Sequence, residues 1–549
     1  MKSRNIAYRI ILLLFLGLHQ PISIFSQFEY QAEKVDIWTD RYLFISGETI
    51  QFAGVLSADS KENILSEVIY VELITATGQK ISQVKIKLSS TSFEGKIVIS
   101  PEILSGYYTL RAYTKWMRNG DPTDYAQIRL KVVNPFSDEI KQVDDSLLDN
   151  SLPLLDNKSS YLSLNKATYE PGEQVHYILD TTFLTANAIT SFSIIPAIAA
   201  PFEKQSDLKI SLPYQKIIYY PETRGITISG KIIRSGDRSL LPYHRVNIHL
   251  ENEKDFISVL SDSTGSFYMA LPERYGSIEL FVIAATLENE NVELLIDQDF
   301  CTKEIAIKMP LFSINDEEKK QVLKMAQAYQ LYSLYKTNDS LSLDLQNDLP
   351  FYGKAFKTIE LDDYVVLDSL AQYFSDLPSW VRVKEVKGNR KIMLSGYQSG
   401  LQLYEALIMV DWVPVDDAER ILAMDPARIK NFDVVISPYI HGGITYGGIL
   451  SISTRKSDFG GLVFPKSGVY INYGFYDRPR DLKVKIQNDF SFKNTTTWVA
   501  DITKETYLSG KDIVAPTIDG DYILLLQSID KEGNRTEEWI EFEVNSVVK

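Results

Sequence analysis

The sequence predicts a mainly β, multi-domain protein: several immunoglobulin-like β-sandwiches, one small α/β domain and one isolated helix. Short segments of alternating apolar and polar residues, separated by turn residues, recur along most of the chain. The 32 tyrosines and 25 phenylalanines favour strands. With 549 residues, the chain also exceeds the roughly 250–300 residues over which one core grows.

Charge and cysteine content narrow the possible partners. The net charge of −15 disfavours nucleic acid, because affinity for phosphate backbones comes from clustered Lys and Arg. The single cysteine, Cys301, excludes internal disulfides and cysteine-based zinc sites. We therefore expect no cofactor and no nucleic-acid partner.

The N-terminus predicts export. Lys2, Arg4 and Arg9 precede an apolar run at 10–18, and the small residue Ser26 precedes Gln27. These features are typical of a secretory signal peptide over residues 1–26. No later stretch reaches the ~20 apolar residues that a membrane-spanning helix needs, so we expect no transmembrane segment after signal removal. The expected location is outer-membrane associated, periplasmic or at the cell surface.

Residues 27–135 predict the first sandwich, with seven short strands. Its phrases TDRYLFISGETIQF and SGYYTLRAYT resemble those of macroglobulin-type domains. An acidic linker is expected at 136–160. The opening phrase then returns as LNKATYEPGEQVHYILD, which predicts a second, smaller sandwich over 161–215.

Residues 225–305 carry a different pattern, whose most recognisable element is the turn Asp262-Ser-Thr-Gly265-Ser-Phe267. It resembles the carboxypeptidase-regulatory-like, transthyretin-like domain, which implies a third sandwich. Asp262 is interpreted as a turn residue in preference to a calcium ligand, because further acidic positions are lacking. A helical connector is predicted over 313–337, capped by Asn315 or Asp316. One face of it, expected to lie against a neighbouring domain, carries Val322, Met325, Ala326, Tyr329 and Tyr332 or Ser333.

Residues 355–457 predict an α/β domain. Its stretch LIMVDWVPVDDAERILAMDPARIKNFDVVISPYIHGGITYGGILSISTRK resembles the plug domain of TonB-dependent outer-membrane receptors. Trp412 departs from that family, which has Gly there. Only 95 residues follow Thr454 (549 minus 454), fewer than a receptor barrel needs, so we expect a plug-like module without a barrel.

A C-terminal sandwich is predicted over 466–549, with TTTWVADI and GDYILLLQSID among its strands. The whole series of modules resembles large exported proteins of Bacteroidota that combine macroglobulin-like, regulatory-like and barrel-less plug modules. That resemblance implies a location and an architecture, but no chemistry.

A catalytic role finds little support in the sequence. His176, His244, His249 and His441 are the histidines beyond the signal peptide, and no HExxH, GxSxG or phosphate-loop motif occurs. The pairs Asp362-Asp363 and Asp416-Asp417 precede helical segments and are interpreted as caps. We therefore expect a non-enzymatic protein.

Aromatic residues are the remaining functional candidates, because Tyr and Trp suit interfaces and sugar stacking. The candidate interface residues are Tyr470, Tyr473, Tyr476, Trp412, His441 and Tyr446. Core packing is an open alternative for the tyrosines. The favoured hypothesis is a scaffold that docks on an outer-membrane protein complex or another envelope protein. The alternative is a glycan- or peptide-binding protein that serves TonB-linked nutrient uptake, and a peptidase or protease inhibitor is a weaker third.

Overall fold

The structure is a computed structural model of the whole chain. It describes residues 32–58, 64–149, 161–180, 183–184, 187–201, 214, 216–251, 253–285, 291–335, 349–376, 380–386, 388–396, 401–441, 444–463, 467–477, 493–501, 513–530 and 534–546. The predicted signal peptide and the second half of the predicted linker lie outside these residues. The described part is mainly β and forms several sheets with few helices.

The N-terminal sandwich packs a three-stranded sheet on a five-stranded sheet. In the first sheet the order is β1 (Glu33–Thr39), β3 (Thr49–Ala58), β6 (Ser92–Val98). In the second it is β2 (Leu43–Ile45), β8 (Ala126–Val133), β7 (Gly106–Tyr113), β4 (Val68–Ile74), β5 (Lys80–Lys87). Side chains along β3 point alternately to the two faces of the sheet, so Ile50 and Phe52 both point into the core.

The composite sandwich combines two segments that the sequence suggested as separate sandwiches, 161–215 and 466–549. Its main sheet has the order β10 (Thr168–Tyr169), β33 (Arg535–Val544), β32 (Gly520–Asp530), β13 (Asn187–Pro196), β30 (Thr497–Val499). Two small pairs complete it, β9 (Leu162–Leu164) with β12 (Tyr177–Leu179) and β11 (Gln174–Val175) with β31 (Ile513–Val514). Strand β32 is buried along both of its faces. Burial on both faces needs residues from 161–215 as well as from 466–549, so the two segments form one sandwich.

The middle sandwich corresponds to the predicted third one. One sheet has the order β17 (Ser266–Ala270), β14 (Thr227–Arg234), β19 (Val292–Ile296). The other has the order β16 (Phe256–Leu260), β15 (Arg245–Leu250), β18 (Ser277–Ala284), β29 (Val469–Gly474). Strand β29 thus joins this sandwich and not the C-terminal one in which the sequence placed it. Gly265 has φ +69°, and Asp262 accepts the N–H groups of Thr264 and Ser266, which is the predicted turn.

Helix α3 (Asp316–Tyr335) begins with a reciprocal cap. The Glu318 N–H donates to Asn315 Oδ1 at 2.8 Å, and the Asn315 N–H donates to Glu318 Oε2 at 2.9 Å. Val322, Met325 and Ala326 are buried, as predicted, in a cluster that also holds residues of β2 and β32. The helix therefore covers the junction between the N-terminal and composite sandwiches.

The α/β unit is built on a five-stranded sheet with the order β20 (Lys357–Glu360), β25 (Ile429–Val435), β28 (Ile449–Thr454), β23 (Leu407–Val410), β24 (Val413–Pro414). The hairpins β21 (Val381–Val386) with β22 (Asn389–Leu394) and β26 (Tyr439–His441) with β27 (Ile444–Tyr446) form two separate two-stranded sheets beside it. Helices α4 (Leu370–Asp376) and α5 (Ala418–Leu422) cover it. Asp417 caps α5 by accepting the N–H groups of Glu419 and Arg420, as predicted.

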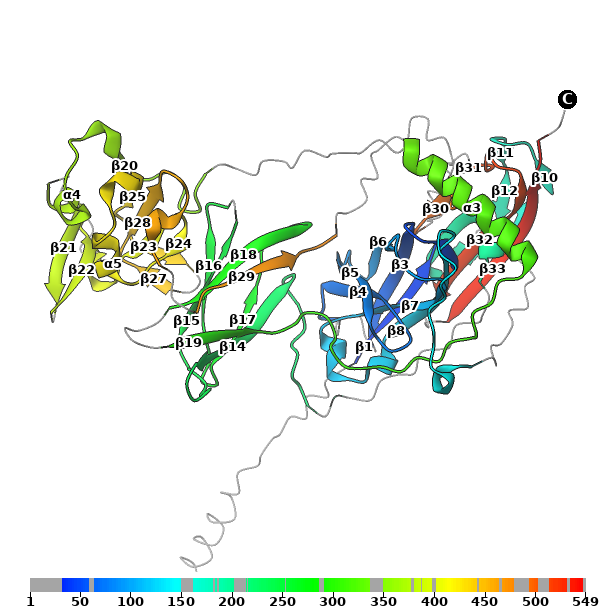
Figure 1. Cartoon of the computed structure of the whole chain (residues 1–549), viewed down its shortest axis with the longest axis horizontal. Coiled ribbons are helices and arrows are strands. Elements are labelled where there is room, and N and C mark those ends of the chain that lie inside the picture. The colour runs from blue at the N-terminus through cyan, green and yellow to red at the C-terminus, as the bar shows by residue number, and fades with distance from the viewer. Residues whose placement is uncertain are drawn as a thin grey trace, which may run out of the picture.

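The chain path is nested (Figure 1). The middle sandwich lies in the sequence between the two halves of the composite sandwich, and the α/β unit lies between β19 and β29 of the middle sandwich. In space the α/β unit occupies one end, the middle sandwich follows, and the other two sandwiches with α3 form the opposite end. Within the described residues, no helix has the length and apolar character required to cross a membrane.

Candidate functional site

Three of the predicted interface residues lie where the α/β unit meets the middle sandwich. Trp412 and Tyr446 belong to an apolar cluster with Phe256 of the middle sandwich. The His441 ring lies 4.6 Å from the ring of Phe256, and Trp412 stacks on Tyr352 with centroids 6.0 Å apart. Chain folding therefore places these three side chains together, at a contact between two parts of the same chain.

Two further interactions strengthen this contact. Arg245 on β15 forms an ion pair with Asp416 at 3.1 Å, and its guanidinium lies 5.6 Å from the ring centre of Tyr446. Phe351 packs edge-on against Phe256 and against Tyr439, with ring centres 5.6 and 5.5 Å apart. Aromatic pairs of this kind contribute beyond the area they bury. We refer to this set of contacts as the aromatic joint.

The three predicted tyrosines of the 469–476 stretch have different environments. Tyr470 on β29 is 64% exposed, whereas Tyr473 and Tyr476 are buried, at 7% and 2% exposure. Of these three candidate interface tyrosines, Tyr470 is open to solvent, whereas Tyr473 and Tyr476 follow the core-packing alternative. Tertiary packing explains the burial of these two tyrosines. The chain at the end of β29 turns toward the N-terminal sandwich, where Tyr476 forms a β-bridge with Lys85.

Tyr473 belongs to a buried ionic cluster, here called the ionic joint, between the N-terminal and middle sandwiches. Its hydroxyl donates to Asp299, whose carboxylate also accepts from Lys85 at 2.6 Å and lies 3.3 Å from Lys115. Lys115 forms a second ion pair with Glu222 at 3.0 Å. All these side chains are nearly inaccessible to water.

Opposite charges set the protonation states in the ionic joint. Burial alone would raise the pKa of Asp299, but the ammonium groups of Lys85 and Lys115 outweigh it and hold that pKa below its ordinary value. For Lys115, burial is outweighed by Glu222 and Asp299, which raise its pKa. Burial lowers the pKa of Lys85 despite the nearby Asp299. Two carboxylates thus balance two ammonium groups, which is the arrangement that a structural joint requires.

A second buried cluster, the ionic clasp, joins the N-terminal sandwich to the late segment 493–501. Arg41 pairs with Glu48 at 2.6 Å and with Asp40 at 3.4 Å. Thr495 donates to Asp40, and the Asn494 side chain donates to Glu48 at 2.7 Å. With two carboxylates against one guanidinium, burial raises the pKa of Asp40 to about 6, although Arg41 partly opposes the rise.

Elsewhere in the described residues, His244, His249 and Cys301 make local contacts. No group of three or more His, Cys, Asp or Glu in this part of the chain is arranged to hold a metal ion. His244 contacts the Pro242 carbonyl at 2.8 Å and His249 the Asp255 carbonyl at 3.0 Å, and burial lowers the pKa of His249. Cys301 is buried, with its Sγ 3.6 Å from the Tyr125 hydroxyl.

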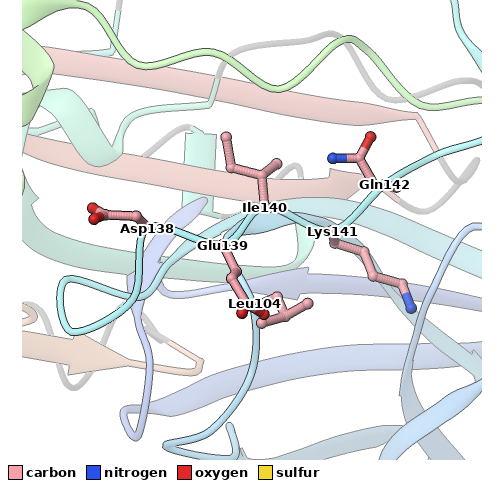
Figure 2. Close-up of a pocket in the computed structure, with 6 residues that line it drawn as sticks. All are labelled: Leu104, Asp138, Glu139, Ile140, Lys141 and Gln142. Carbon is pink, nitrogen blue, oxygen red and sulfur yellow. The ribbon is translucent and has the colours of Figure 1, made fainter.

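A hollow of about 570 Å³ lies at the surface of the N-terminal sandwich. It is lined by Leu104, Asp138, Glu139, Ile140, Lys141 and Gln142. Figure 2 shows that Asp138 and Lys141 point away from each other. Because its polar groups do not converge on a common point, the hollow lacks the organisation typical of a ligand site.

The α/β unit carries an exposed feature that the sequence analysis missed, the apolar loop 364–366. Tyr364, Val365 and Val366 are exposed at 40%, 82% and 80%. The sequence suggested a helix through this stretch, but α4 begins only at Leu370. Two adjacent β-branched residues followed by Asp368 were the signal for an extended loop.

Comparison with known proteins finds structurally similar proteins but assigns no family to this chain. No family model matches the sequence, and no curated protein matches it. The native conformation of the Escherichia coli alpha-2-macroglobulin aligns with 94% of this chain and 40% of its own, at 10% identity and a TM-score of 0.22. A mutant of the Salmonella alpha-2-macroglobulin aligns with 94% of this chain and 39% of its own, at 11% identity and a TM-score of 0.23.

The CARDB domain of a Pyrococcus furiosus protein aligns over 99% of its length with 20% of this chain, at 13% identity and a TM-score of 0.16. The chain spans less than half the length of the alpha-2-macroglobulins that it matches. At these identities and TM-scores, the neighbours define neither a family nor an activity for this chain.

Proposed function

We propose that this protein is a non-enzymatic, exported scaffold that docks on an outer-membrane protein complex through its α/β unit. The observation that carries the proposal is the apolar loop 364–366, where three consecutive hydrophobic residues face water. A soluble fold gains nothing by exposing such a run, so its natural place is a contact with another molecule.

Hydrogen bonds hold the backbone of the loop at both of its ends. The hydroxyl of the buried Tyr373 accepts the N–H of Leu367 at 3.2 Å and donates to the carbonyl of Val365 at 3.2 Å. The Tyr364 N–H donates to the Leu361 carbonyl at 3.1 Å. Because these bonds hold the two valines outward before any partner arrives, binding costs less conformational entropy.

The charges beside the loop favour a protein partner over a lipid surface. Asp363 and Asp368 flank it and are exposed, and Asp362 is paired with Arg455. Carboxylates at these positions would be repelled by anionic lipid headgroups. The resemblance of the stretch 407–456 to receptor plug modules supports an outer-membrane protein as the class of partner.

The proposal is tested by crosslinking and co-purification of the full-length chain from envelope fractions. We expect a specific partner with the wild type, and a loss of at least tenfold in its recovery with Val365→Asp/Val366→Asp. Leu334→Asp, a change at a residue 78% exposed on α3, is the matched control and should leave recovery unchanged. Recovery of the chain as a monomer in the soluble fraction would contradict the proposal.

A glycan- or peptide-binding role is the second candidate, and Tyr470 is the observation that favours it. This residue is 64% exposed, and its ring centre lies 4.5 Å from that of Phe281. An exposed ring on a rigid strand is suited to stacking on a sugar. Glycan-array binding that disappears with Tyr470→Ala would support this role, whereas an array without any signal would count against it.

A further inference from the structure

The hairpin β21–β22 is cationic, although the chain as a whole carries a net charge of −15. It lies at the end of the α/β unit that is farthest from the other domains (Figure 1). Its described residues include the four cations Arg382, Lys384, Arg390 and Lys391, against the single acid Glu385. Positive charge is therefore concentrated on one short element of an acidic protein.

The strand register divides the hairpin into two faces. Val381 pairs with Leu394 and Val383 with Ile392, and these residues pack into the core of the α/β unit. Because side chains alternate along a strand, Arg382, Lys384 and Lys391 lie on the opposite, outer face. All three are exposed.

Of the three cations on the outer face, one has a carboxylate partner among the described residues. Lys384 is directly opposite Lys391, a like-charge pairing that opposes hairpin formation. Lys391 has a partner in Glu405 at 2.5 Å. Within the described residues, no carboxylate lies within ion-pair distance of Arg382 or Lys384. By contrast, Arg390 on the inner face is paired with Glu419.

We infer that the outer face of β21–β22 binds an extended, acidic segment of a partner protein. In the described part of the chain the hairpin forms a sheet of two strands, so no third strand lies beside β21 on the side away from β22. A peptide added there would place alternate carboxylates over Arg382 and Lys384 at the ~6.6 Å repeat of a strand. This inference rests on the proposed docking function and names the chemistry of the partner.

Two other roles explain the outer face of the hairpin less well than binding of an acidic peptide does. One is binding to a lipid membrane, and the other is prevention of aggregation through the strand edge. Peripheral membrane surfaces combine cations with large apolar anchors, but here Val386, at 36% exposure, and the half-buried Met393 are the apolar members. Charged residues also prevent edge-to-edge association of strands, but alternating signs would do so without placing Lys384 opposite Lys391.

The test measures binding of a fluorescent hexaglutamate peptide to the full-length chain by anisotropy, at 50 and 200 mM salt. We expect saturable binding that weakens at the higher salt, and a loss of at least tenfold in affinity with Arg382→Glu/Lys384→Glu. Arg382→Gln/Lys384→Gln should lose an intermediate amount. Lys319→Glu/Lys324→Glu, the same charge change on the exposed face of α3, should alter affinity less than twofold.

Three results would overturn the inference. The first is that the hairpin variants bind the peptide as tightly as the wild type does. The others are binding to phosphatidylglycerol vesicles without peptide binding, and charge-dependent self-association in sedimentation. The circular dichroism spectrum of each variant must match the wild type, and the Gln pair provides a second measurement if the Glu pair does not fold. If an envelope partner is recovered equally with Arg382→Glu/Lys384→Glu, this inference fails while the docking function stands. Loss of the partner with Val365→Asp/Val366→Asp tests the docking function separately.

Discussion

Asn494 donates a hydrogen bond to Glu48 at 2.7 Å, although the two residues are 446 positions apart in the sequence. The same side chain donates to the Met325 carbonyl on α3 at 3.1 Å. One amide therefore connects the late segment, the helix and the N-terminal sandwich. Because the middle sandwich and the α/β unit lie between these segments in the chain, this contact closes the nested path.

The first prediction concerns this closure. Asn494→Ala leaves the buried Glu48 without one of its donors, and the orphaned group should cost about 1–3 kcal/mol in the free energy of unfolding. Thr496→Ala is the control, because the Thr496 hydroxyl reaches the Ile194 carbonyl only at 3.5 Å and should cost less than about 0.5 kcal/mol. Urea denaturation of the full-length chain measures both, and equal losses would refute the assignment.

The second prediction concerns pH. The pKa of Asp40 is raised to about 6 in the folded chain, above the ordinary value of about 3.9 that applies when it is unfolded. The folded state therefore binds this proton more readily, and the resulting stability is present below pH 4 and lost as pH rises through 6. At about 1.4 kcal/mol per pKa unit, the loss is on the order of 3 kcal/mol.

Asp40→Asn removes the titrating group and leaves Arg41 balanced by Glu48. We expect the stability difference between Asp40→Asn and the wild type to change by on the order of 3 kcal/mol between pH 4 and 7, in favour of the variant at pH 7. Denaturation curves at half-unit pH steps measure it. A difference that does not vary with pH would show that Asp40 does not titrate in this range.

The third prediction compares two ion pairs across the same boundary. Asp299→Asn leaves Lys85 and Lys115 buried without one of their counter-charges and should destabilise the chain by about 3–5 kcal/mol. Glu273→Gln removes the exposed partner of Lys87 and should cost less than about 1 kcal/mol. Thermal unfolding compares the two variants. A small effect of Asp299→Asn would contradict the structural role of the ionic joint.

The fourth prediction separates two tyrosines of one strand. Tyr473→Phe deletes the hydroxyl that donates to the buried Asp299 and should cost about 1–3 kcal/mol. Tyr470→Phe changes a 64% exposed side chain and should shift stability by less than about 0.5 kcal/mol. The same denaturation measurement applies. If both changes were neutral, the ionic joint would not depend on Tyr473.

The sequence predicted features that depend on local patterns. Alternation predicted the sandwiches, the Asn315 cap predicted the start of α3, and Asp417 predicted the start of α5. Each of these depends on residues close together in the chain. The turn at Gly265 was predictable for the same reason.

The sequence did not predict which distant segments share a sheet. β13 pairs with β32 across more than 300 residues, and no local pattern encodes that choice. The same limit explains the burial of Tyr473, because Asp299 and Lys85 reach it from segments that are far away in the sequence. The apolar loop 364–366 was hidden by an apolar periodicity that also fits a helix.

The measurement that tests the central claim most directly is site-specific photocrosslinking in the native envelope. A photoreactive residue replaces Val365 in one full-length variant and Leu334 on α3 in another. Docking through the α/β unit predicts a discrete adduct with an envelope protein from position 365 and none from position 334. The absence of an adduct from position 365, or the same adduct from both positions, would contradict a docking function of the α/β unit.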